Sequence, residues 1–139
     1  MISHKYKAIF IHIPKTGGTS VKKIISKYEF TRVELNCAED GSNDDVTGFY
    51  KKGSALRMRR IIPDDVWDSY YKFAFVRDPY DRAVSNWKYL NKSIPFDEFI
   101  KRGGKNVYQK WHYDICQSTH LDGSGVDFVG RFERLQDDF

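Results

Sequence analysis

The sequence predicts a single α/β domain, built as a three-layer sandwich with a central parallel β-sheet and a P-loop-like anion-binding loop. Short apolar runs alternate with segments of helical periodicity, as in parallel sheets covered by helices. Two of these runs end in a short loop that opens directly into a helix. The 139 residues, of which 40% are hydrophobic, suffice for one packed core over residues 1–139 and exclude a disordered chain.

The first strand–loop–helix unit begins at residues 8–13, AIFIHI, a β-branched and aromatic run that ends at Pro14. A helix is predicted from Thr19 onward, with Thr19 or Ser20 placed to cap its first turn. Its apolar positions fall at helical spacing: Val21, Ile24, Ile25 and Tyr28.

The middle of the chain is less regular. Residues 30–35 alternate well enough for a second strand, and residues 36–48 form an acidic loop rich in Gly, Asn and Asp. Residues 51–62 are basic with interspersed apolar positions. Pro63 then begins a short acidic helix, DDVWDSYY.

The second strand–loop–helix unit begins with residues 72–76, KFAFV, predicted as a third strand. It leads into a helix with Pro79 in its first turn and an apolar stripe made by Ala83, Val84, Trp87 and Leu90. The remaining predicted elements are helices over 96–102 and 107–116, a strand over 126–129 and a helix over 134–139.

Composition limits the partners and the compartment. The net charge of +4 suits an anionic ligand but is small for a dedicated nucleic-acid binder. The two cysteines, Cys37 and Cys116, do not form a disulfide framework or a metal-type pair, which fits a reducing compartment. There is no signal-peptide pattern and no apolar run long enough to span a bilayer. We therefore expect a soluble, cytoplasmic protein.

Residues 14–20, PKTGGTS, have the composition of an anion cradle. Two glycines allow backbone N–H groups to point inward, the helix amino terminus adds partial positive charge, and Lys15 adds a full one. The order differs from the Walker A pattern GxxxxGK[ST], because the lysine precedes the glycines, and this disfavours a Mg-ATP site. The alternative is a plain tight turn with a solvated lysine.

A second candidate anion site follows the third predicted strand. Arg77 stands at the strand end and Ser85 lies in the next helix, so a guanidinium and a hydroxyl can hold one phosphate together. The alternative is that Arg77 pairs with Asp78 or Asp81 and that Ser85 bonds back to the carbonyl of its own helix.

These motifs resemble those of a known family. IFIHIPKTGGTSV resembles the 5′-phosphosulfate loop of sulfotransferases that use 3′-phosphoadenosine 5′-phosphosulfate (PAPS), most of all their carbohydrate branch. The pattern R-D-P-x-x-R-x-x-S is similar to the 3′-phosphate motif of the same family. The resemblance continues through VWDSYYKFAFVRDP, QSTHL and VDFVGRFERLQDDF, and so covers most of the chain apart from the acidic loop.

The resemblance implies an enzyme that transfers a sulfuryl group from PAPS to a hydroxyl, most simply of a carbohydrate, by in-line displacement that leaves adenosine 3′,5′-bisphosphate (PAP). It implies no metal. Lys15 would stabilise the bridging oxygen, and Arg77 with Ser85 would hold the 3′-phosphate. The cofactor-binding residues are then Lys15, Thr16, Gly17, Gly18, Thr19, Ser20, Arg77 and Ser85.

The general base is less well defined. Glu34 ranks first, because it lies where glutamate-type sulfotransferases place their base, and His12, His112 and His120 are the other candidates. The chain also departs from the family pattern. Relatives often carry Lys-His-x-Ser-Ala before the basic helix, whereas residues 51–55 read KKGSA here.

The acceptor side leaves alternatives open. The basic stretch 51–60 is either a solvated helix face or a surface for an anionic glycan, and Trp111 is a weak candidate for stacking on a sugar. Family members usually continue for several helices beyond this point, so the chain is expected to be a minimal variant or a fragment. The rival functions are a non-catalytic module that binds PAP or PAPS, an NTP-dependent enzyme, and a nucleic-acid-binding protein.

Overall fold

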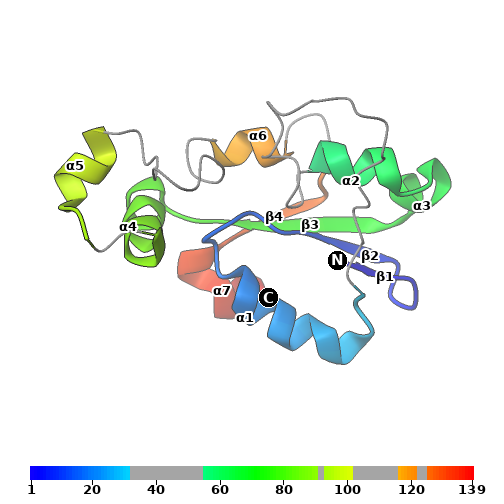
Figure 1. Cartoon of the computed structure of the whole chain (residues 1–139). Coiled ribbons are helices and arrows are strands. Elements are labelled where there is room, and N and C mark those ends of the chain that lie inside the picture. Colours follow the sequence, from blue (N-terminus) through cyan, green and yellow to red (C-terminus); the bar gives the residue numbers. More distant parts are fainter. Residues whose placement is uncertain (32–54, 91–92, 102–115, 122–124) are drawn as a thin grey trace.

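A computed structural model describes residues 1–31, 55–90, 93–101, 116–121 and 125–139 (Figure 1). Its centre is a four-stranded sheet in the order β1-β2-β3-β4. Strands β2, β3 and β4 run parallel, and β1 pairs antiparallel with β2. The strands are β1 Ile2–Ser3, β2 Ala8–Ile11, β3 Tyr71–Val76 and β4 Phe128–Arg131. The predicted α/β class is therefore confirmed, with a mostly parallel sheet.

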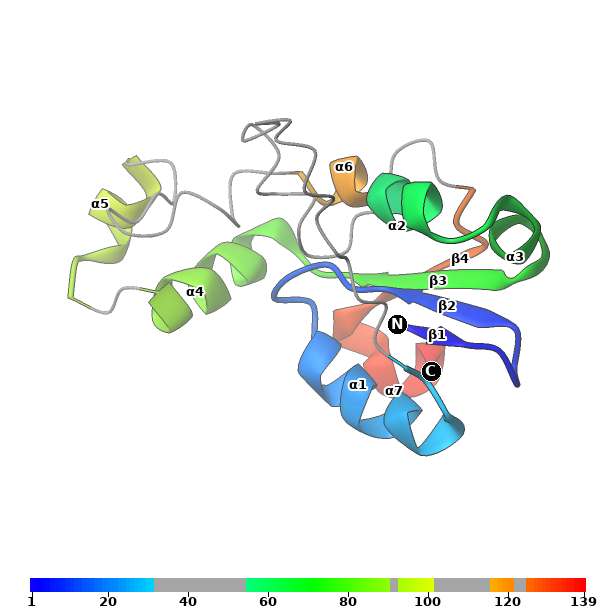
Figure 2. The same cartoon turned by 45° about the vertical axis from the view of Figure 1, so that its right-hand side comes forward.

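Helices lie on both sides of this sheet. Helices α2, α3 and α6 lie on one side and α1 and α7 on the other, while α4 and α5 extend past the end of β3 (Figures 1 and 2). The helices are α1 Gly18–Ile25, η1 Ser26–Tyr28, α2 Ala55–Ile61, α3 Asp64–Ser69, α4 Pro79–Leu90, α5 Phe96–Lys101, α6 Gln117–Leu121, η4 Phe132–Arg134 and α7 Leu135–Asp138. No helix among the described ranges has the length and apolar character needed to cross a bilayer.

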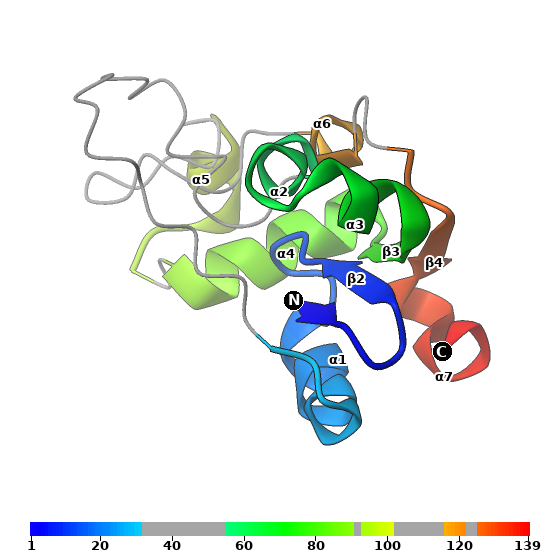
Figure 3. The same ribbon diagram turned by 90° about the vertical axis from the view of Figure 1, so that its right-hand side faces the viewer.

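The central strands are buried on both faces, which explains why they read as continuous apolar runs. On one face, Ile9 and Ile11 of β2 pack in a cluster with Trp67 of α3. On the other face, Phe10 packs with Phe75 and with the buried side of α1. Figure 3 looks along the sheet from the side and shows α1 and α2 on opposite faces.

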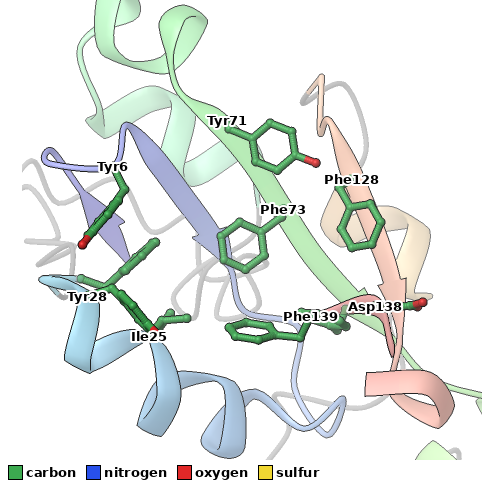
Figure 4. A pocket seen from close by; sticks show the side chains of 10 residues that line it. Tyr6, Ile25, Tyr28, Tyr71, Phe73, Phe128, Asp138 and Phe139 are labelled. Atoms are coloured by element: carbon green, nitrogen blue, oxygen red, sulfur yellow. The ribbon is translucent and has the colours of Figure 1, made fainter. Parts of the chain in front are cut away.

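An aromatic groove of about 480 Å³ lies on the α1 side of the sheet (Figure 4). It is lined by ten residues: Tyr6, Ile25, Tyr28, Phe30, Tyr71, Phe73, Phe75, Phe128, Asp138 and Phe139. None of them belongs to the loops that follow β2 and β3, so the groove is separate from the predicted anion sites.

The predicted cap of the first helix is wrong. Helix α1 begins at Gly18, and its N-cap is Gly17, which has a left-handed conformation with φ of 80° and makes no side-chain capping bond. Thr19 and Ser20 lie within the first turn and are exposed. The glycine turn itself starts the helix, so no hydroxyl cap is needed.

Two strand predictions also differ from the structure. Strand β4 is shifted from 126–129 to Phe128–Arg131, because Asp127 instead makes paired bonds with Lys72: Asp127 N–H to the Lys72 carbonyl at 2.9 Å, and Lys72 N–H to Asp127 Oδ2 at 2.6 Å. In the predicted strand 30–35, Thr31 forms an isolated bridge with Ile2. Residues 32–35, the acidic loop 36–48 and residues 107–115 lie outside the described residues.

The predicted apolar stripe of α4 is not its most buried face. Arg82 and Asn86 are only 8% and 3% exposed, whereas Trp87 is half-buried. Trp87 packs edge-on against Phe96 at the start of α5 and donates Nε1–H to the Ile94 carbonyl at 2.8 Å. The stripe thus packs on α5, while the polar face turns to a neighbouring loop.

The close approach of β3 and β4 predicts that Gly130→Ala destabilises the fold. A Cβ at position 130 would lie 2.4 Å from the ring of Phe75, which is 1% exposed and has little room to move. Overpacking of this kind costs about 1–3 kcal/mol, which urea denaturation would measure. Val129→Ala, at a position 41% exposed on the same strand, is the control and should cost less. Equal stability of the Gly130→Ala variant and the native protein would contradict this packing.

Candidate functional site

The loop after β2 is a tight left-handed turn. Lys15 has φ of 68° and Gly17 has φ of 80°, and the Thr16 hydroxyl between them donates to the Ile13 carbonyl at 2.9 Å. Thr16 is fully buried, and its hydroxyl is used within the turn rather than presented to a ligand. The turn ends where Val21 N–H bonds the Gly17 carbonyl at 3.1 Å, which begins α1.

Both glycines in this loop are required by close contacts. A Cβ on Gly18 would lie 2.0 Å from the imidazole ring of His12, and a Cβ on Gly17 would lie 2.7 Å from the ring of Phe132. Gly17 also has the left-handed φ that side chains rarely adopt. The glycines therefore allow the backbone to lie close to both rings. The N–H groups of the first turn of α1 have no helical partners, as at the start of any helix.

The loop after β3 is held in place by an amide side chain. Arg77 N–H donates to Gln117 Oε1 at 2.8 Å, and the Gln117 amide donates back to the Arg77 carbonyl at 2.6 Å. This reciprocal pair links the end of β3 to α6. The guanidinium of Arg77 lies 4.3 Å from the ring centroid of Phe132.

The alternative roles considered for the second motif are not seen in the described part of the chain. Asp78 does not pair with Arg77. Its Oδ1 accepts the N–H groups of Tyr80 and Asp81 at 2.9 and 3.1 Å and so caps α4. Ser85 is half-buried on α4, and its hydroxyl makes no hydrogen bond with the described residues. The guanidinium and the hydroxyl are thus left available to a ligand.

The two loops meet at one edge of the sheet. Phe132 lies against Gly17 of the first loop and against the guanidinium of Arg77 in the second. Burial, followed by the positive charge of Arg77, holds the pKa of Lys15 below that of an ordinary lysine. The Lys15 ammonium lies 4.2 Å from the ring centroid of Tyr89 on α4. The Lys15 ammonium and the Arg77 guanidinium are therefore close enough to interact electrostatically.

This site fits an anionic ligand. Among the described residues, Arg77 Nε is buried and has no hydrogen-bond partner, and Arg77 takes part in no ion pair. A buried donor without an acceptor is costly, and a phosphate or sulfate oxygen would satisfy it. Lys15 adds a second cation nearby. The two cations lie against aromatic rings and form no ion pair with the described residues, so their charge can be matched by an anionic ligand.

Of the remaining residues predicted from the sequence, the structure describes only some. Glu34, the first-ranked base, lies outside the described residues, as do His112, Trp111 and residues 51–54 of the basic stretch. His12 packs its ring on Gly18, and His120 is buried on α6.

Sequence reasoning missed several residues that shape the site. Arg82 of α4 donates Nε–H to the Pro14 carbonyl at 3.1 Å, across 68 positions of sequence. Gln117, Tyr89 and Phe132 were likewise not predicted. Arg82 is part of the pattern R-D-P-x-x-R-x-x-S, which offered a signal for it. Nothing local marks the other three, because each acts through contacts with distant segments.

Comparisons with protein families and with curated proteins find sulfotransferases. The model of the family described as "Sulfotransferase family" matches residues 1–139. Carbohydrate sulfotransferase 10 from Xenopus laevis is 30% identical over 93 residues, which cover 63% of this chain and 24% of that protein. Carbohydrate sulfotransferase 10 from Danio rerio is 27% identical over 130 residues, or 86% of this chain and 34% of that protein.

Human carbohydrate sulfotransferase 9 is 25% identical over 135 residues, which cover 91% of this chain and 28% of that protein. The chain therefore spans between a quarter and a third of the length of these curated relatives. No solved structure matches it with significance.

The electrostatic effect of Arg77 on Lys15 predicts how the pKa of Lys15 responds to substitution. We expect Lys15 to lose its proton at a lower pH than the exposed lysines do, and Arg77→Gln to raise its pKa, because removal of a nearby positive charge favours the ammonium form. Since burial is the larger cause, the increase should be partial. NMR titration of the lysine side chains measures both effects.

Arg59→Gln provides the control for this titration, because it changes the net charge equally and Arg59 is not among the groups that shift the pKa of Lys15. If Lys15 titrated together with the exposed lysines, or were unaffected by Arg77→Gln, the two cations would not share a site.

Proposed function

Because the chain belongs to the sulfotransferase family, we propose that this edge of the sheet binds PAPS and that the protein transfers its sulfuryl group to a hydroxyl acceptor. The observation that carries the proposal is the convergence of Lys15 and Arg77 on one region, with the buried Nε of Arg77 lacking a partner among the described residues. Two cations brought together from separate loops suit a donor with phosphates at both ends of an adenosine.

Residues 14–20 would act as the P-loop-like cradle of the 5′-phosphosulfate. The N–H groups of Gly17 to Ser20 stand at the beginning of α1, where backbone donors lack helical acceptors and the helix dipole favours an anion. Arg77 and Ser85 would hold the 3′-phosphate, one through charged donors and the other through its hydroxyl. The helices on both sides of the sheet support the expected three-layer sandwich.

The reaction would be an in-line displacement at sulfur. The acceptor oxygen forms the new S–O bond, the bond from sulfur to the 5′-phosphate oxygen breaks, and PAP departs with that electron pair. Lys15, as an ammonium, would neutralise the charge that grows on the departing oxygen. Its lowered pKa is compatible with this role as long as the group stays protonated at the working pH.

The acceptor's proton needs a base, and Glu34 remains the proposed one. The transfer requires no metal in this scheme, because Lys15 and the N–H groups supply the positive charge. A carbohydrate hydroxyl is the proposed acceptor, on the ground that the relatives compared above are named carbohydrate sulfotransferases. A cytoplasmic location is a further proposal that follows from the cysteine content alone.

The second candidate function is a module that binds PAP or PAPS without turnover. It is favoured by the departure from the family pattern at residues 51–55, which read KKGSA where relatives often carry a histidine. The two candidates share the nucleotide site and differ in chemistry. Binding of PAP without transfer of labelled sulfate to any of a broad set of acceptors would favour the module.

Lys15→Ala tests the catalytic assignment. We expect transfer of radiolabelled sulfate from PAPS to fall by about 100- to 1000-fold, the usual effect of removing one stabilising donor from a transition state. Lys23→Ala, at an exposed position of the following helix α1, should leave transfer unchanged. Circular dichroism would show both variants folded. Native turnover by Lys15→Ala would refute the role given to this lysine.

Arg77→Ala and Ser85→Ala test the nucleotide site independently of turnover. Loss of a charge-assisted contact should weaken PAP binding by about 10- to 100-fold for Arg77, and loss of one neutral hydrogen bond by about fivefold for Ser85. Isothermal titration calorimetry measures both. Ser69→Ala on α3, whose hydroxyl bonds its own helix, is the control and should bind normally. Normal binding by Arg77→Ala would contradict the site.

A further inference from the structure

Lys15 has an unfavourable backbone conformation. Lys15 has φ of 68°, in the left-handed region that residues with a Cβ seldom occupy. Such a conformation persists only when surrounding contacts hold it, and it is concentrated at functional sites. The structure should therefore contain a group that fixes this conformation.

Arg82 makes that contact. It is 8% exposed, and its Nε donates to the Pro14 carbonyl at 3.1 Å. The Pro14 carbonyl and the Lys15 N–H belong to one planar unit, so a bond to the carbonyl also fixes the direction of that N–H and limits φ at Lys15. Rotation of the peptide toward an ordinary φ would break this bond.

Helix α4 also contacts the far end of the same lysine. Tyr89 lies two helical turns after Arg82, and therefore on the same side of α4. The Lys15 ammonium is 4.2 Å from the centroid of its ring. One side of α4 thus holds Lys15 at both ends: Arg82 through the backbone and Tyr89 through the ammonium.

We propose that Arg82 is a positioning residue: by holding the Pro14 carbonyl it keeps Lys15 in its left-handed conformation and so directs Lys15 into the anion site. The effect of Arg82 on ligand binding rests on the proposed function, whereas its effect on the peptide does not. Arg82 acts through Lys15 and the loop, and it needs no contact with the nucleotide.

Two substitutions separate the hydrogen bond from the charge. Arg82→Gln keeps an N–H donor at the position of Nε and loses the charge, while Arg82→Met keeps a side chain that reaches the position of Nε and loses both. Lys88→Met, at an exposed position of α4, controls for the loss of one positive charge from this helix.

NMR reports the conformation directly, because a positive φ brings the amide proton and the α-proton of one residue close together and gives a strong NOE between them. We expect the native protein, Arg82→Gln and Lys88→Met to show this signal at Lys15, and Arg82→Met to lose it. A positive φ retained in Arg82→Met would overturn the proposal, whatever ligand the site binds.

Calorimetry with PAP forms the second arm. Arg82→Met should bind about tenfold more weakly, as expected for the loss of a hydrogen bond that holds the site, and Arg82→Gln within about twofold of the native protein. If Arg82→Met does not fold, Arg82→Gln decides. Native φ and native affinity in that variant support the proposal, and loss of both overturns it.

A native protein that binds no PAP refutes the proposed function, while the NMR comparison still tests Arg82.

Discussion

Parallel pairing of β2 with β3 is the constraint on which the site depends. The register places Ile11 beside Ala74, so the carboxyl ends of the two strands, and the loops that follow them, lie at the same end of the sheet. Each loop then leads directly into a helix, α1 after β2 and α4 after β3. Without this pairing, Lys15 and Arg77 would have no reason to lie together. The proposed anion site is therefore a consequence of topology as much as of motif.

Local pattern was sufficient to predict the elements that carry the motifs. The run 8–13 and the run 72–76 were recognisable because buried parallel strands are apolar on both faces. The helix beginning at Pro79 was recognisable because proline suits a first turn. Strand β1, in contrast, has two residues, too few for any periodicity, and the start of α1 depended on the left-handed Gly17 rather than on a hydroxyl cap.

The contacts that shape the site could not be predicted in the same way. Phe132 follows β4, yet its ring lies against both Gly17 and Arg77, and Gln117 of α6 holds the backbone of Arg77. These residues are ordinary in their own segments, and only the tertiary fold gives them a role. The polar face of α4 shows the same limit. Helical periodicity favours an apolar face as the buried one, but this helix buries Arg82 against a carbonyl.

The neighbours of the two cations explain how the site can be stable when free and still attract an anion. Lys15 lies over the ring of Tyr89 and Arg77 over the ring of Phe132. A ring face attracts a cation by about 0.5–2 kcal/mol but leaves its charge unneutralised. A carboxylate in either place would cancel that charge and compete with a phosphate for the same donors. Aromatic partners thus hold the two side chains in position while preserving the positive potential that a phosphorylated ligand requires.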